Sequence, residues 1–187
     1  MLLPFFEWCE QLWLGQFIIG SNWLFPVIES VHLLGLSVLG GAILVVDMRL
    51  LGLALTRVPV TDIATRLLPW TKAGFTVMVI TGVLLFYAIP VRTYQSVFFR
   101  AKVVMLILAG LNVWIFNNRV FLRVAEWDRD ARTPRAARRA ALFSLILWGG
   151  IIVAGRMIAY NWFDCDIQPQ PAIVNFVAGC VVPPAAP

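Results

Sequence analysis

Residues 23–48 read WLFPVIESVHLLGLSVLGGAILVVDM, an apolar run that is long enough to cross a bilayer. A membrane-spanning helix needs about 20 consecutive, mostly apolar residues. Three further runs of this kind follow near 71–89, 97–118 and 140–160. Of the 187 residues, 60% are hydrophobic and only 13% are charged, more apolar surface than a soluble domain of this length could bury. The sequence therefore predicts an all-α, polytopic membrane four-helix bundle that forms one domain over residues 1–187.

The stretch before the first run has a different composition. Residues 2–19 alternate large aromatic and aliphatic side chains with Glu7, Glu10 and glutamines. Such a mixture favours an N-terminal interfacial helix that lies along the membrane surface. A secretory signal peptide would begin with basic residues, whereas none precedes Arg49, so we expect this segment to be retained.

The basic residues indicate the orientation of the bundle. Eleven of the fifteen Lys and Arg fall around the first and third connections: Arg49, Arg57, Arg66, Lys72, Arg119, Arg123, Arg129, Arg132, Arg135, Arg138 and Arg139. By the positive-inside rule these connections face the cytoplasm. The tail over 161–187 has no Lys or Arg and carries Asp164 and Asp166. We therefore expect a bacterial inner-membrane protein with periplasmic N- and C-termini. Acidic residues are interleaved with the arginines, which disfavours nucleic acid as a partner.

All three cysteines, Cys9, Cys165 and Cys180, fall on the predicted periplasmic side, where disulfides form. We expect a Cys165–Cys180 bridge that closes the proline-rich tail into a small lid, with Cys9 free or joined to a partner. The alternative is that all three are unpaired thiols. The prolines of this tail are Pro169, Pro171, Pro183, Pro184 and Pro187.

The only histidine, His32, lies within the first apolar run. An imidazole in hydrocarbon needs a hydrogen-bond partner or a metal. His32 lies about nine residues into the helix, roughly 13 Å from its outer end. A hydrogen bond to Glu29 or to a serine is the plainer alternative. Glu29, one turn earlier, is also a candidate for a proton relay.

Basic residues near the outer ends of the later runs suggest an anionic group between the helices. Arg100 and Lys102 enter the third run and Arg156 lies near the end of the fourth. Haem b would satisfy these demands together, with iron on His32 and propionates reaching the three cations. Contact with phospholipid headgroups would explain the same cations.

The second axial position of such a haem has several candidates. Met105 is the best placed, with Met78 and Met157 behind it, although methionines at helical spacing usually pack in cores. A five-coordinate iron is an alternative, as is a homodimer that pairs two His32 side chains. Copper is a further candidate metal because thioether and imidazole ligands suit Cu(I).

Other residues of the apolar runs have structural interpretations. Gly40, Gly41, Gly149 and Gly150 are predicted to be helix-packing sites. Asp47 and Arg49 at the cytoplasmic end are expected to pair with each other or with Lys72. Most tryptophans, including Trp127, fall near run ends and are predicted to form interfacial belts. Trp114 and Trp148 lie deeper and would be the ones to contact a bound ring.

Four stretches carry a resemblance to known families: VIESVHLLGLSVLGG, DMRLLG, FFRAKVVMLILAGLN and GRMIAY. They resemble an uncharacterised bacterial inner-membrane family of four-helix proteins. More distantly, an early histidine in the first helix and a lysine entering the third resemble the membrane protoporphyrinogen oxidase and copper-resistance D bundles. The oxidase resemblance implies a haem-ligand role for His32 and a supporting role for Lys102. A second histidine, which that family's ligation pattern requires, is absent from this chain.

The sequence thus favours a haem b-binding integral membrane protein that transfers electrons with a periplasmic or membrane redox partner, such as a quinone. A non-catalytic membrane anchor or assembly subunit of a larger complex is the first alternative. A copper-handling membrane protein is the second. No nucleophile motif or phosphate-binding loop indicates another chemistry.

Overall fold

The computed structural model describes residues 3–130, 132–160, 162–163, 165 and 167–180. Asp164, Asp166, Pro183, Pro184 and Pro187 lie outside these residues. The described chain is helical and contains no strand. The helices in chain order are α1 Leu3–Glu10, α2 Trp13–Gly20, α3 Leu24–Leu51, α4 Val60–Ala88, α5 Pro90–Gln95, α6 Val97–Arg119, η1 Phe121–Glu126, α7 Arg135–Met157, η2 Ile158–Tyr160 and α8 Ala172–Ala178.

Four helices, α3, α4, α6 and α7, are long and apolar enough to span a membrane. Their ends follow from local chemistry. At the end of α3, Gly52 has φ +76°, a left-handed conformation that glycine adopts without strain and that closes the helix. At the start of α6, the Ser96 hydroxyl accepts a hydrogen bond from the Phe99 amide. All-α membrane architecture is thereby confirmed.

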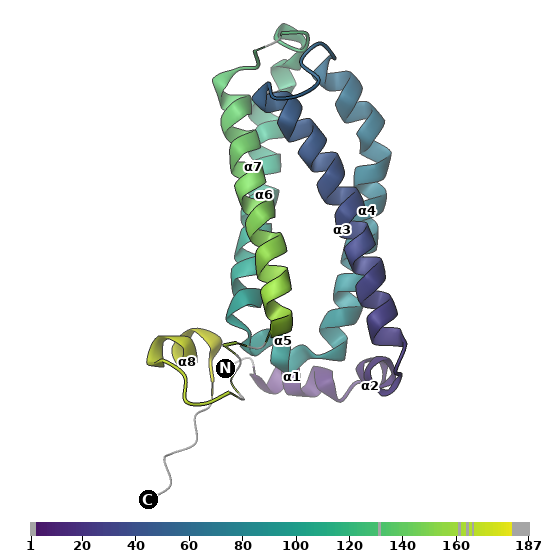
Figure 1. The fold of residues 1–187 in the computed structure, drawn as a ribbon, viewed down its shortest axis with the longest axis vertical. Helices are drawn as coiled ribbons and strands as arrows, with labels where there is room; N and C mark the ends of the chain where they lie inside the picture. The colour runs from purple at the N-terminus through teal and green to yellow at the C-terminus, as the bar shows by residue number, and fades with distance from the viewer. Residues whose placement is uncertain (1–2, 131, 161, 164, 166, 181–187) are drawn as a thin grey trace, which may run out of the picture.

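The long helices form two pairs that run the length of the molecule (Figure 1). α4 packs along α3, α6 packs along α7, and α3 also contacts α7, whereas α4 and α6 do not pack closely on each other. The α3–α4 contact is close because glycines face the neighbouring helix. A Cβ atom on Gly74 would lie 2.9 Å from the Leu39 backbone nitrogen, and one on Gly35 would lie 2.9 Å from Val77 Cγ1.

This packing corrects the glycine expectation. A Cβ atom on Gly40, Gly41 or Gly149 would meet no atom within 4 Å, so these three are not packing sites within the chain. Gly150 is one, since its Cβ atom would lie 2.6 Å from Met105 Sδ. Sequence shows where small residues are but not which side of a helix meets its neighbour.

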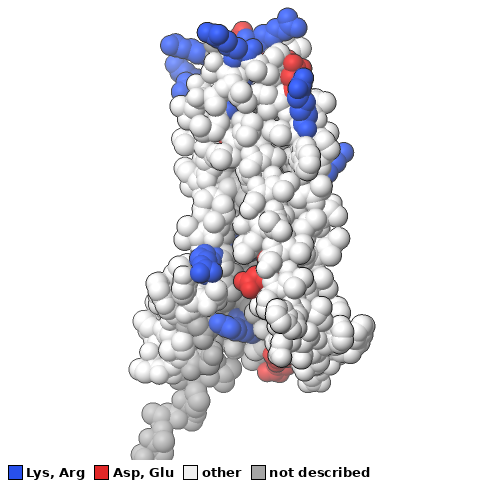
Figure 2. Space-filling model, turned by 45° about the vertical axis from the view of Figure 1, so that its right-hand side comes forward, with Lys and Arg blue, Asp and Glu red and all other residues white. Residues whose placement is uncertain are grey.

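Most basic residues gather at one end of the bundle (Figure 2). We call this end, which contains residues 52–59 and 120–134, the arginine-rich end. Trp127 is buried there beside Leu50, Val60 and Ala137, and so belongs to a core cluster instead of an interfacial belt. Helices α4 and α7 begin earlier than expected, at Val60 and Arg135. Arg66 and Lys72 therefore lie on α4 and not in the connection before it.

The opposite end carries the short helices α1, α2, α5 and α8, and we call it the disulfide end (Figure 1). The expected interfacial helix over 2–19 is two helices, α1 and α2, which lie across the end of the bundle (Figure 1). Cys165 and Cys180 form the expected disulfide. Cys9 is free and buried.

Candidate functional site

His32 lies at the contact between α3 and α4. Its Nδ1 is 2.8 Å from the Thr81 hydroxyl oxygen, and that hydroxyl donates to the Val77 carbonyl at 2.6 Å. Because a hydroxyl has one hydrogen, Thr81 accepts from His32, which places the imidazole proton on Nδ1. Nε2 of the neutral ring is then unprotonated and has a free lone pair, which is the state in which imidazole binds metal ions. The ring packs on Gly82, whose added Cβ atom would lie 3.3 Å from His32 Cε1.

Lys102 shares the neighbourhood of His32 although it lies on another helix. Its ammonium is close enough to act electrostatically on the imidazole. A Cβ atom on Gly155 of α7 would lie 3.5 Å from Lys102 Nζ. Helices from both pairs therefore contribute a polar group to one region inside the bundle.

The methionine candidates have other neighbours. Met105 Sδ packs against Gly150 of α7, and Met78 lies near Gly35 in the α3–α4 contact. The structure thus gives His32 and Met105 different partners and does not pair them. Within the described residues, no group of three or more His, Cys, Asp or Glu side chains is placed to hold a metal ion.

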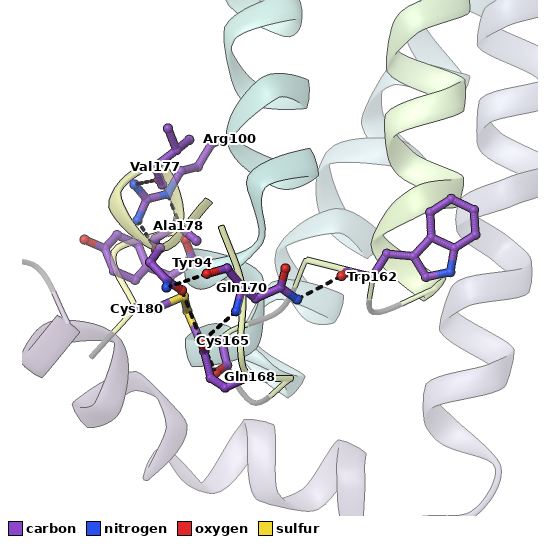
Figure 3. The surroundings of a disulfide bond; sticks show 10 residues. Tyr94, Arg100, Trp162, Cys165, Gln168, Gln170, Val177, Ala178 and Cys180 are labelled. Carbon is purple, nitrogen blue, oxygen red and sulfur yellow. Dashed lines mark hydrogen bonds between the residues drawn. A yellow bond between two sulfur atoms is a disulfide. The ribbon is translucent and has the colours of Figure 1, made fainter. Parts of the chain in front are cut away.

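Arg100 and Arg156 have partners at the disulfide end. Arg100 donates to the carbonyls of Tyr94, Val177 and Ala178 and stacks over the Tyr94 ring, so it holds α8 on the bundle (Figure 3). Arg156 lies over the Tyr160 ring, 5.1 Å from its centroid. Of the three predicted propionate partners, Lys102 is the one whose charge acts on His32 in the described part of the chain.

Glu29, the predicted proton-relay residue, is exposed on α3. Its carboxylate makes no hydrogen bond to His32 within the described part of the chain, where Thr81 has that role. The relay stays a prediction.

A second polar site lies nearer the arginine-rich end, in a cavity of about 670 Å³ between the four long helices. Its lining is mostly apolar, but Asp47 of α3, Asn112 of α6 and Ser144 of α7 reach it. Asp47 is 5% exposed and lies beside Ser144, while its Oδ2 is buried without a hydrogen-bond partner among the described residues. Asn112 donates to the Ala140 carbonyl.

Sequence reasoning missed this site because it paired Asp47 with Arg49 or Lys72. Arg49 instead donates to the carbonyls of Val58, Asp128 and Asp130 and joins the two connections of the arginine-rich end. Asp47 lies beside Ser144, which is far away in the sequence. The available signal was that Asp47 is the last acidic residue of an apolar helix and shares a face with His32.

Comparison with known proteins gives one match. The model of a family of unknown function, DUF6644, matches residues 5–161. No curated protein and no solved structure matches this chain. The distant resemblance to the oxidase and copper-resistance bundles therefore receives no support from these comparisons.

Proposed function

The chain belongs to DUF6644, a family of unknown function, and we propose that it is a haem b-binding membrane protein that transfers electrons. The observation that carries this proposal is the His32–Thr81–Val77 hydrogen-bond chain, which directs the imidazole proton to Nδ1 and leaves Nε2 free. Histidines that bind metal generally donate their other ring N–H to an oxygen in this way.

The residues around His32 suit this group in three respects. Gly82 allows the His32 ring to pack closely against α4. Lys102 supplies a cation in the same region, which is what a propionate requires. The surrounding helices are apolar along their length, as a macrocycle requires. When bound, haem supplies one-electron chemistry.

Each residue has a distinct part in the proposal. His32 would hold the iron, Thr81 would fix the orientation and tautomer of the imidazole, and Lys102 would meet a carboxylate. Met105 packs against α7 at Gly150, which favours an iron held by His32 alone over His–Met ligation. Copper handling is less favoured, because the methionines are dispersed over different helix contacts.

The test is the haem content of protein purified from membranes. The native chain is expected to show a Soret band and about one haem per chain. His32→Ala should abolish both, while Ser37→Ala, a change at an exposed α3 position, should leave them intact. Circular dichroism checks that both variants fold. A colourless, folded native protein that cannot be loaded with haem would refute the proposal and leave the membrane-anchor alternative.

The proposal includes the orientation of the bundle. With the arginine-rich end in the cytoplasm and the disulfide end in the periplasm of a bacterial inner membrane, His32 would lie in the periplasmic half and serve a periplasmic partner. Impermeant thiol reagents applied to intact cells should label a cysteine placed at Trp162 and spare one placed at Arg129.

A further inference from the structure

The Asp47 cavity has the dimensions of a small-molecule site. Its volume of about 670 Å³ lies within the range of about 300–1,000 Å³ that ligand pockets occupy. Along α3 its lining runs from Leu39 to Leu50, about 16 Å at the helical rise. The cavity is therefore elongated along the bundle.

The cavity opens toward the lipid. α4 and α6 do not pack closely, and the lining residues Phe75 of α4 and Leu106 of α6 are exposed. Both lie within helices that are long and apolar enough to span a membrane. A molecule dissolved in the bilayer can enter between these two helices without passing through water.

The polar side of the cavity requires a hydrogen-bond donor. Asp47 Oδ2 is buried without a hydrogen-bond partner in the part of the chain that the structure describes, and burying a carboxylate oxygen unpaired is unfavourable. The Asn112 side chain donates one amide hydrogen to the Ala140 carbonyl, and its Oδ1 is a further acceptor. Lys72 at the lining adds positive charge, which disfavours a cationic ligand. A neutral hydroxyl group meets these requirements.

The apolar side of the cavity indicates the body of the ligand. Four aromatic side chains line it: Phe75, Phe116, Phe121 and Trp148. Aromatic rings pack favourably on one another in offset or edge-to-face arrangements. The ligand is therefore expected to carry a ring as well as an aliphatic part.

We propose that this cavity binds a lipid-soluble hydroquinone, with a ring hydroxyl donating to Asp47 and the ring among the aromatic side chains. The site lies apart from His32 and uses none of its partners. The inference therefore goes beyond the haem proposal and holds whether or not His32 binds iron.

The test measures binding of 2-decyl-1,4-hydroquinone, kept anaerobic, to the full chain in phosphatidylcholine nanodiscs. Partition into empty nanodiscs is subtracted. The matched probe is the dimethyl ether of the same compound, which keeps the ring and tail but cannot donate. Saturable binding of the hydroquinone is expected, at least about tenfold tighter than that of the ether.

Two variants test the site and two serve as controls. Asp47→Asn should weaken hydroquinone binding by about tenfold. Gly110→Leu should abolish it, since Gly110 lines the cavity and its Cβ direction is open space. The controls are Gly149→Leu and Asp62→Asn, which should bind the hydroquinone as the native chain does. Gly149 also faces open space but does not line the cavity, and Asp62 is exposed at the start of α4.

Three results would overturn the inference. The first is that the dimethyl ether binds with the same affinity as the hydroquinone. The second is that the folded Gly110→Leu variant binds the hydroquinone with native affinity. The third is that the hydroquinone is displaced when phosphatidylethanolamine replaces phosphatidylcholine in the nanodiscs. The last result would assign the cavity to an amine-headed lipid. The measurement has no haem readout, so its failure is distinct from failure of the His32 proposal.

Discussion

Three ionisable residues of α3 lie along one apolar helix, and each has a different kind of partner. Arg49 is fully buried and donates to backbone carbonyls of two connections. Asp47 lies beside Ser144 and has one oxygen, Oδ2, without a hydrogen-bond partner in the described part of the chain. His32 donates to Thr81 and keeps one nitrogen unprotonated. Arg49 Nη1 is likewise buried without a hydrogen-bond partner among the described residues, so each of the three residues retains a polar atom that this part of the chain does not pair.

Removing the hydroxyl of Thr81 tests the proposed role of His32. Thr81→Val keeps the shape of the side chain and removes the acceptor of the Nδ1 proton. Haem affinity is expected to fall by about 10–100-fold, the usual effect of losing such a partner. The midpoint potential of the remaining haem should rise, because a less electron-rich imidazole stabilises ferric iron less. Haem titration and redox potentiometry measure the two effects.

The matched control for Thr81 is Thr76→Val, at an exposed position of the same helix. It should leave both quantities unchanged. A Thr81→Val protein with native haem affinity and native potential would show that the hydrogen bond has only a packing role.

At the scale of elements, the α3–α4 pair depends on the absence of side chains at its contact. A Cβ atom on Gly74 would lie 2.9 Å from a backbone nitrogen of α3, which cannot move aside as a flexible side chain can. Gly74→Ala is therefore expected to destabilise the protein by about 1–3 kcal/mol. Thermal unfolding in detergent measures the change.

Gly40→Ala on α3 is the control for this prediction. Its added methyl group meets open space, and alanine has the higher helix propensity. The variant should be as stable as the native chain or slightly more stable. Equal destabilisation by both substitutions would contradict the close α3–α4 contact.

The start of α4 is capped by a residue far away in the sequence. Asp128 accepts from the Thr61 amide at 2.9 Å and from the Thr61 hydroxyl at 2.6 Å. Desolvation, the largest single influence, raises the pKa of Asp128, but the hydrogen bonds from Thr61 and the Val60 amide and the nearby Arg129 together hold it below its ordinary value. The carboxylate thus stabilises the fold above its ordinary pKa. This stabilisation is lost as the pH falls through the lowered pKa.

Asp128→Asn is accordingly expected to lower the melting temperature at pH 7. The difference from the native chain should shrink as the pH falls from the ordinary aspartate pKa through the lowered pKa of Asp128, below which the native carboxyl is also neutral. Asp130→Asn, at an exposed neighbouring position, should have little effect at either pH. A native-like melting temperature for Asp128→Asn at pH 7 would contradict the cap.

At the scale of the whole molecule, the two ends of the bundle are closed by different structures. The arginine-rich end is closed by Arg49, Asp128 and a buried Thr133 hydroxyl that donates to the Leu50 carbonyl. The disulfide end is covered by short helices and the tail (Figure 1). Between them, the two helix pairs enclose the His32 region and the Asp47 cavity.

Among the described residues, the tail at the disulfide end is held by a disulfide and by hydrogen bonds to Arg100. Cys165 and Cys180 close a loop, and Arg100 binds the last carbonyls of α8. A loop of about 15 residues gains roughly 3 kcal/mol from its disulfide. Replacing both cysteines by serine should therefore speed cleavage of the tail by proteinase K, while the helix content of the bundle stays native. Cys9→Ala, which keeps the disulfide, should be cleaved at the native rate.

The sequence by itself determined the class, the number and approximate position of the membrane-spanning helices, and the disulfide. These depend on properties that lie along the chain: the length of an apolar run, the placement of charge and the compartment of a cysteine. The starts of α4 and α7 were predicted too late in the chain. An apolar run shows only the part of a helix that lies in the membrane, whereas both helices begin earlier, among polar residues.

Only the tertiary structure decided which polar groups meet. Thr81 is 49 residues from His32 in the chain, and Asp128 is 67 from Thr61. Such pairs depend on how helix faces are turned and how closely two backbones approach, which periodicity does not encode. The same reason explains why Gly35 and Gly74, and not Gly40 or Gly41, are the packing sites. It also explains why Asp47, expected to pair at the surface, is buried beside Ser144 in a cavity.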